Sequence, residues 1–113
     1  MATERLIMSA SRIEIFEQML AGDPGNTMVM FGLAKEYEKA GDEAKLIETL
    51  ERYLAAADDE GNAYGMLARA YERTKESDKA RTAYERGIDA AAAHGHPGMA
   101  EEYRTMLINE PAP

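Results

Sequence analysis

The chain has 113 residues, of which 45% are hydrophobic and 30% are charged, and its formal net charge is -8. A chain of this length buries one continuous core, which predicts a single domain over residues 1–113 and excludes a large multidomain enzyme. Because the sequence contains no cysteine, it has no disulfide framework, thiolate metal site or cysteine nucleophile.

The acidic balance and the absence of long apolar runs restrict the classes of partner. The chain has 21 Asp and Glu against 13 Lys and Arg, whereas a nucleic-acid phosphate backbone attracts a basic surface. No apolar run approaches the roughly 20 residues of a membrane-spanning helix, and Leu6, Ile7 and Met8 form too short a run for a secretory signal. We therefore expect no nucleic-acid partner, no membrane partner and a cytoplasmic location.

Helix-forming residues and regularly placed stop signals predict an all-α fold. Ala, Glu, Lys, Leu and Arg make up about half of the chain, as is typical of repeated helices. Valine occurs only at Val29, which argues against a sheet. Glycine, proline and acidic stops divide the chain into about six helical segments, near residues 11–21, 27–40, 43–57, 61–74, 78–93 and 97–109.

The ends of these segments carry residues that commonly cap helices. The predicted N-terminal caps are Ser11 in a capping box with Glu14, Asn26 or Thr27, Asp42 and Ser77. Pro97 stands at the first position of the last helix, where its missing N–H costs nothing. The glycines expected to close helices in a left-handed conformation are Gly22, Gly41 and Gly95.

The sequence repeats itself at a shift of 34 residues. This shift places Leu33 on Leu67, Ala34 on Ala68, Tyr37 on Tyr71 and Glu38 on Glu72. The matches lie on an apolar stripe with helical spacing, and the following helices match in the same frame. A helix pair that repeats with this period resembles the tetratricopeptide repeat (TPR). We expect a half repeat at residues 10–26, full repeats at 27–60 and 61–94, and a capping helix at 95–109.

The resemblance implies a superhelical solenoid and a non-enzymatic adaptor that binds a peptide segment. In such arrays the first helix of each repeat lines a concave groove, which is the surface offered to ligands. A stripe about 100° around the helix from the core stripe predicts the groove residues. They are Met28, Phe31, Lys35, Glu38, Lys39, Asn62, Met66, Arg69 and Arg73.

Equivalent groove positions should be neighbours if the repeats stack regularly. Lys35 would then lie beside Arg69, and Lys39 beside Arg73, which favours a ligand with carboxylates. The absence of a side chain at Gly65 would leave a gap for an apolar anchor of the ligand. The alternative is an ordinary solvated face, in which Glu38 and other glutamates neutralise the cations on their own helix.

The N-terminal segment suggests an alternative function. The predicted core spacing leaves Ile7, Met8 and Ile15 without an assigned partner. Residues 1–10 could fold back over this apolar surface, or a second copy of the chain or a larger protein could cover it. The alternative to the peptide groove is therefore a self-associating scaffold subunit, a possible homodimer.

The sequence predicts no catalytic residue, metal site or cofactor. His94 and His96 lie in one loop, and two histidines cannot complete a usual zinc site without acidic help. We expect His96 to cap the following helix. The acidic run from Asp58 to Glu60 lacks the alternating ligands of a calcium loop, and is expected to favour the N-terminus of the next helix.

Overall fold

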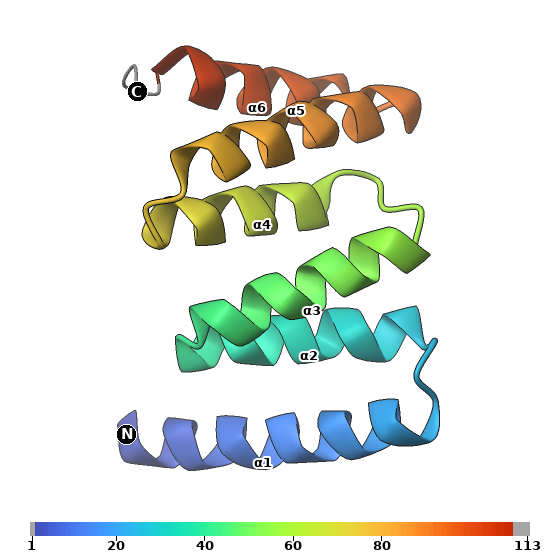
Figure 1. Ribbon diagram of the computed structural model, residues 1–113, viewed down its shortest axis with the longest axis vertical. Coiled ribbons are helices and arrows are strands. Elements are labelled where there is room, and N and C mark those ends of the chain that lie inside the picture. Colours follow the sequence, from blue (N-terminus) through green and yellow to red (C-terminus); the bar gives the residue numbers. More distant parts are fainter. Residues whose placement is uncertain (1, 110–113) are drawn as a thin grey trace. The chain divides into compact units, whose positions relative to one another are not determined.

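A computed structural model describes the backbone of residues 2–109 and the side chains of residues 11–109. All secondary structure in this part of the chain is helical, which confirms the predicted all-α class (Figure 1). The helices are α1 (Ala2–Gly22), α2 (Thr27–Ala40), α3 (Glu43–Ala56), α4 (Asn62–Arg73), α5 (Ser77–Ala93) and α6 (Pro97–Asn109). No helix among the described residues is both long and apolar enough to cross a membrane.

The first helix is longer than predicted. α1 begins at Ala2, so Ser11 lies inside the helix and the expected capping box with Glu14 is wrong. Residues 2–10 contain no Gly or Pro and consist largely of good helix formers, so nothing stops the helix at Ser11. They continue α1 instead of folding back over it. The other five segments agree with the prediction to within one residue at each end.

Side-chain caps explain where several helices begin. The side-chain oxygens of Asn26 and Asp42 accept hydrogen bonds from N–H groups in the first turns of α2 and α3, both at 3.2 Å. At α4 the buried carboxylate of Asp59 accepts from the N–H groups of Gly61 and Ala63, at 2.8 and 3.0 Å. Ser77 does not cap α5 as predicted, because it is the first helical residue and Glu76 takes the capping position.

Left-handed residues close three of the helices. Gly41 and Gly95 both have φ of 75°, as predicted. Lys75, which is 34 residues after Gly41, adopts the same conformation with φ of 65° although it carries a side chain. Gly22 does not have a positive φ and instead forms the last residue of α1, so its predicted left-handed role is wrong.

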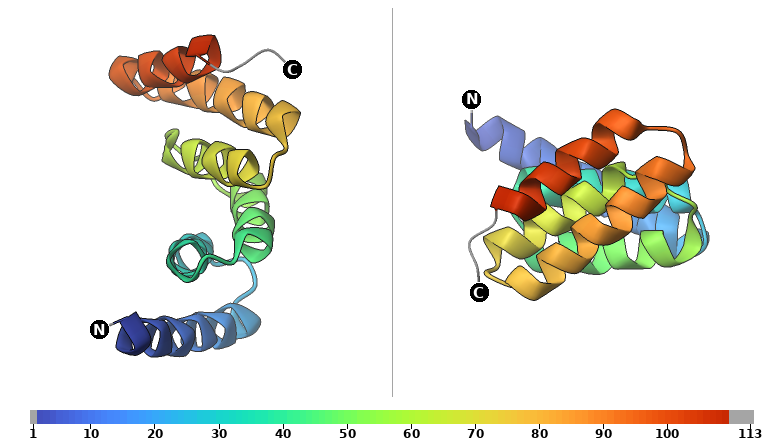
Figure 2. Two further views of the ribbon diagram at one scale, coloured as in Figure 1. Left: turned by 90° about the vertical axis from the view of Figure 1, so that its left-hand side faces the viewer. Right: turned by 90° about the horizontal axis from the view of Figure 1, so that it is seen from above.

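The chain divides into two compact units after Ala57. In the first unit α2 packs against both α1 and α3, and successive helices run antiparallel (Figures 1 and 2). The ring of Phe16 on α1 lies over Gly32, where an added Cβ would come within 3.2 Å of Cε1. Leu33 and Leu50 are buried between these helices. Each of the two outer helices therefore covers one side of α2.

In the second unit α5 packs against both α4 and α6. The ring of Tyr103 from α6 fills the space left by Gly65 on α4 and Gly87 on α5. Its hydroxyl donates a hydrogen bond to the carbonyl oxygen of Gly61 at 2.9 Å. The gap that was expected at Gly65 is therefore not open to a ligand, because a side chain of the same unit occupies it.

Candidate functional site

The first candidate surface is the α2 face, formed by Met28, Phe31 and Lys35 on α2 with Tyr53 on α3. Met28 is 85% exposed, and Phe31 is half-buried. The Phe31 and Tyr53 rings lie 5.2 Å apart between centroids, and the Lys35 ammonium lies 4.9 Å from the Phe31 centroid. Packing of this kind holds the aromatic rings in place before any ligand arrives. The α2 face thus combines the packed Phe31 and Tyr53 rings, which we call the aromatic shelf, with the exposed thioether of Met28 and the ammonium of Lys35.

The predicted charged neighbours on α2 differ in how far they are neutralised. Lys39 lies 3.7 Å from the carboxylate of Glu36, which is buried and also lies 3.8 Å from Arg12 of α1. Glu38 is exposed. The contact of Lys35 is with the Phe31 ring. Lys35 is therefore better placed than Lys39 to attract an anion.

The predicted residues on α4 have mixed exposure. Asn62, Arg69 and Arg73 are exposed, whereas Met66 is only 7% exposed and offers little surface to a ligand. The carboxylate of Glu72 accepts a hydrogen bond from the hydroxyl of Tyr84 at 2.6 Å. Burial, followed by this hydrogen bond, raises the pKa of Tyr84 above its ordinary value. Lys35 belongs to the first unit and Arg69 to the second. Their expected proximity therefore stays a prediction.

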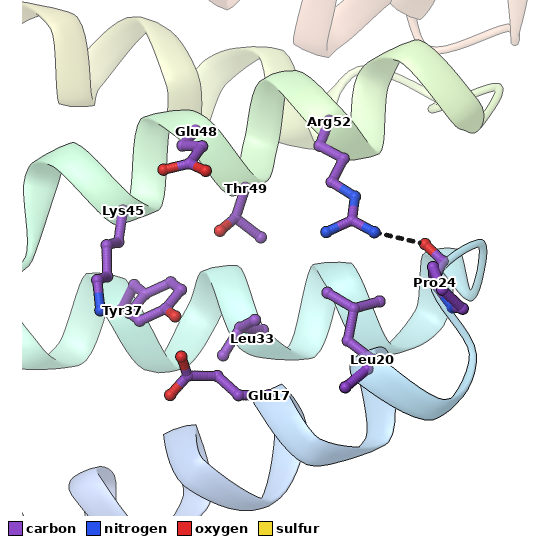
Figure 3. A pocket seen from close by; sticks show the side chains of 10 residues that line it. Glu17, Leu20, Pro24, Leu33, Tyr37, Lys45, Glu48, Thr49 and Arg52 are labelled. Carbon is purple, nitrogen blue, oxygen red and sulfur yellow. Dashed lines mark hydrogen bonds between the residues drawn. The ribbon is translucent and has the colours of Figure 1, made fainter.

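A second candidate site is the α1–α3 cleft, a cavity of about 490 Å³ within the first unit. Side chains from three helices and the loop after α1 line it (Figure 3). They are Glu17, Leu20, Ala21, Pro24, Leu33, Tyr37, Lys45, Glu48, Thr49 and Arg52. Because Leu33 and Lys35 are about 160° apart around the helix, the cleft and the α2 face lie on opposite sides of α2.

Polar groups are fixed at both ends of the cleft. At one end the guanidinium of Arg52 donates a hydrogen bond to the carbonyl oxygen of Pro24 at 2.8 Å (Figure 3). At the other end the ammonium of Lys45 lies 5.8 Å from the centroid of the Tyr37 ring. Burial raises the pKa of Tyr37 to about 12, with the charge of Glu17 and a hydrogen bond to it as further causes. The Tyr37 hydroxyl is therefore a neutral donor at physiological pH.

No sequence pattern predicts this cleft. Leu33 and Tyr37 belong to the stripe that is predicted to face the core, and both are indeed buried. Lys45, Thr49 and Arg52 share one face of α3 at intervals of three and four residues, and that polar stripe was the available signal. Whether this stripe lines a cleft depends on the distance between α1 and α3, which a local sequence pattern does not predict.

Two histidine–carboxylate pairs connect loops in the second unit. The Nε2 atoms of His94 and His96 lie 3.1 Å from Asp58 and 2.9 Å from Glu60, respectively. The His96 side chain thus contacts Glu60, and this hydrogen bond is the main cause that lowers the pKa of Glu60. Among the described residues, no group of three or more His, Cys, Asp or Glu side chains is arranged to hold a metal ion.

The predicted self-association surface is only partly described. Ile15 is 56% exposed on α1, and Met19, one turn further on, is 49% exposed. Ile7 and Met8 belong to α1, but their side chains lie outside the described residues.

Comparisons with known proteins identify the family. The model of the tetratricopeptide repeat matches residues 61–94, which span α4 and α5. The curated TPR repeat-containing protein PA0015 of Pseudomonas aeruginosa is 33% identical over 98 residues. This alignment covers 87% of the present chain and 92% of the relative. The chain therefore belongs to the tetratricopeptide repeat family.

Proposed function

We propose that the protein binds a segment of a partner protein through the α2 face. TPR proteins generally mediate protein–protein interactions and are generally not enzymes, which supports a binding role. The observation that carries the proposal is the 85% exposure of Met28, one helical turn before Phe31, whose ring packs at a tilt against that of Tyr53. Burial of a large exposed apolar side chain and the adjacent aromatic surface by a partner contributes favourable free energy of binding.

The charge of Lys35 on the α2 face favours an acidic segment. Lys35 lies beside the aromatic shelf, and Arg69 and Arg73 are exposed on α4 in the second unit. These cations contrast with the net charge of -8 of the chain. A partner segment with a carboxylate that pairs with Lys35 or Arg69 would bind in preference to a basic segment, which these cations repel. We propose no catalytic residue, cofactor or nucleic-acid ligand.

Affinity capture with variants of the α2 face tests this function. Immobilised protein is incubated with an extract of the source cell, and the retained proteins are compared between wild type, Met28→Ser, Lys35→Glu and Arg69→Glu. We expect each variant to lose the partner while its helical circular dichroism stays unchanged. Arg104→Glu, an exposed cation on α6 that pairs with Glu101 at 3.3 Å, is the matched control. Undiminished capture by Met28→Ser and Lys35→Glu would rule out the α2 face.

A second candidate function is self-association through α1. The exposure of Ile15 and Met19, one turn apart, supports it, because two such helices could cover each other's apolar stripes. Sedimentation velocity at low and high protein concentration decides between monomer and dimer. We expect Ile15→Asp to abolish any concentration-dependent dimer, and a wild-type chain that stays monomeric removes this candidate.

A further inference from the structure

We propose that the α1–α3 cleft is a second binding site, which takes an acidic segment of a partner protein. An aliphatic side chain of that segment enters the cleft, and a neighbouring carboxylate pairs with Arg52. The site is distinct from the α2 face, because it lies on the opposite side of α2, and it does not depend on the function proposed for that face.

The size and lining of the cleft suit an aliphatic side chain. Its volume of about 490 Å³ lies within the roughly 300–1,000 Å³ typical of ligand sites. Leu20 supplies aliphatic surface toward the Pro24 end, and Leu33 lies between Leu20 and Tyr37 (Figure 3). Ala21 also lines the cleft. Burying an aliphatic group against such surface is favourable in proportion to the area removed from water.

Arg52 is the polar group best placed to select the charge of the ligand. Its guanidinium has five N–H donors, and the structure uses one nitrogen, Nη2, for the bond to Pro24. It forms no ion pair with any residue whose side chain is described. The bond to Pro24 fixes the guanidinium at the mouth of the cleft, so less side-chain entropy is lost when a carboxylate pairs with its remaining donors.

The acidic groups of the cleft lie toward its other end. Glu17 is hydrogen-bonded to Tyr37, which also contacts the ammonium of Lys45. Glu48 lies on α3 one turn before Arg52 and is the acidic side chain that opposes an anionic ligand most directly. Charges more distant than the Debye length of roughly 8 Å are screened at physiological salt, so the net charge of the chain matters less than these neighbours.

A protein segment fits this arrangement better than a compact metabolite. The two walls come from α1 and α3, with α2 between them, and charged side chains stand on both walls (Figure 3). Grooves between helices commonly receive a segment that places apolar anchors at the bottom and polar groups at the rim. The cleft therefore offers a pocket for an aliphatic side chain and, in Arg52, a cation for a carboxylate. In the bound segment this carboxylate would lie about one residue or one helical turn from the aliphatic side chain.

Small probes measure the charge preference directly. The amide signals of ¹⁵N-labelled full-length protein are followed by NMR during titration with isocaproate, isocaproamide and isohexylamine, which share one aliphatic chain. We expect isocaproate to bind most tightly, with shifts concentrated in residues 17–24 and 45–52. Arg52→Gln should weaken isocaproate about tenfold, because a charge-assisted hydrogen bond contributes about that factor. Its effect on isocaproamide should be small.

Three further variants separate the cleft from general charge effects. Glu48→Gln removes the opposing carboxylate and should strengthen isocaproate binding, whereas Lys35→Glu on the other side of α2 should leave it unchanged. Thr49→Leu fills the cleft and should abolish binding of both isocaproate and isocaproamide. If Thr49→Leu fails to fold, the opposite effects of Arg52→Gln and Glu48→Gln still decide the matter. Tighter binding of isohexylamine, or the absence of localised shifts with all three probes, would overturn the proposal.

A displayed peptide library tests the class of the natural ligand. Random peptides are selected on immobilised wild-type protein, and their binding is then measured in the presence of excess isocaproate. We expect selected peptides to pair an aliphatic residue with a nearby Asp or Glu and to be displaced by isocaproate. Selected peptides that lack acidic residues, or that Arg52→Gln binds equally well, would show that the cleft does not recognise an acidic segment.

Discussion

The insertion of Tyr103 between two glycines leads to a sharp prediction about Gly65. A Cβ atom added at Gly65 would lie 2.9 Å from Cζ and 3.0 Å from Cε1 of the Tyr103 ring. On the other side, a Cβ at Gly87 would lie 2.9 Å from Cε2 of the same ring. The ring has no room to move away from one helix without approaching the other. Gly65→Ala should therefore destabilise the protein even though alanine favours helices.

The expected change in the free energy of unfolding follows from two costs and one gain. Overpacking a well-filled site costs about 1–3 kcal/mol. Displacement of the ring also breaks the hydrogen bond from Tyr103 to Gly61, which contributes about 0.5–1.5 kcal/mol. The higher helix propensity of alanine returns about 1 kcal/mol. We expect Gly65→Ala to lower the free energy of unfolding by about 0.5–3.5 kcal/mol in total.

A double-mutant cycle measures this coupling. Urea unfolding followed by circular dichroism gives the free energy of unfolding for wild type, Gly65→Ala, Tyr103→Leu and the double variant. Once the ring is removed, Gly65→Ala should become neutral or stabilising by up to about 1 kcal/mol. Gly98→Ala on α6, where an added Cβ meets nothing within 4 Å, is the control. An equal penalty for Gly65→Ala in both backgrounds would refute the packing argument.

Three further predictions concern single residues. Lys75→Gly should raise the free energy of unfolding by about 0.5–1 kcal/mol in urea melts, because glycine adopts a positive φ without the left-handed penalty of roughly 1–2 kcal/mol. The hydrogen bond to His96 lowers the pKa of Glu60 below its ordinary value of 4.5. The stability that Glu60 contributes is therefore present above pH 4.5 and is lost as the pH falls through the lowered pKa. In acid unfolding measurements, Glu60→Gln should make the free energy of unfolding depend less on pH in this range. Tyr37 should ionise near pH 12 in NMR titrations with labelled tyrosine, and stability should fall as pH rises from 10 to 12 because only the unfolded chain loses this proton there; an ordinary pKa for Tyr37 would show that Glu17 and burial do not act on it.

Helix positions were predictable because their signals are local. Asn26 and Asp42 cap α2 and α3 through hydrogen bonds that span three residues. Gly41 and Lys75 close equivalent turns, and the positive φ of Lys75 shows that the repeat imposes this conformation even without glycine. Ser11 misled the prediction because its neighbours on both sides are helical, so a cap residue there has no helix start to cap.

The cleft and the Tyr103 contact were not predictable from local patterns. Tyr103 reaches Gly61 across 42 positions in the chain, and Arg52 reaches Pro24 across 28. Repeat periodicity identifies which side chains face the core, but it does not say which neighbour fills each space. Both features depend on how helices that are distant in sequence pack within each unit.

Equivalent positions in the two repeats solve the same packing problem differently, and this difference suggests where ligand binding should concentrate. Phe31 and Tyr53 correspond, at the repeat shift of 34 residues, to Gly65 and Gly87. In the first unit the two aromatic rings pack on each other, and both side chains stay half-buried. In the second unit both rings are missing, and Tyr103 of α6 fills the space and is itself buried. The aromatic surface therefore remains available to a partner on α2 but has been used internally on α4, so substitutions at Met28 and Phe31 should weaken binding more than those at Asn62 and Met66.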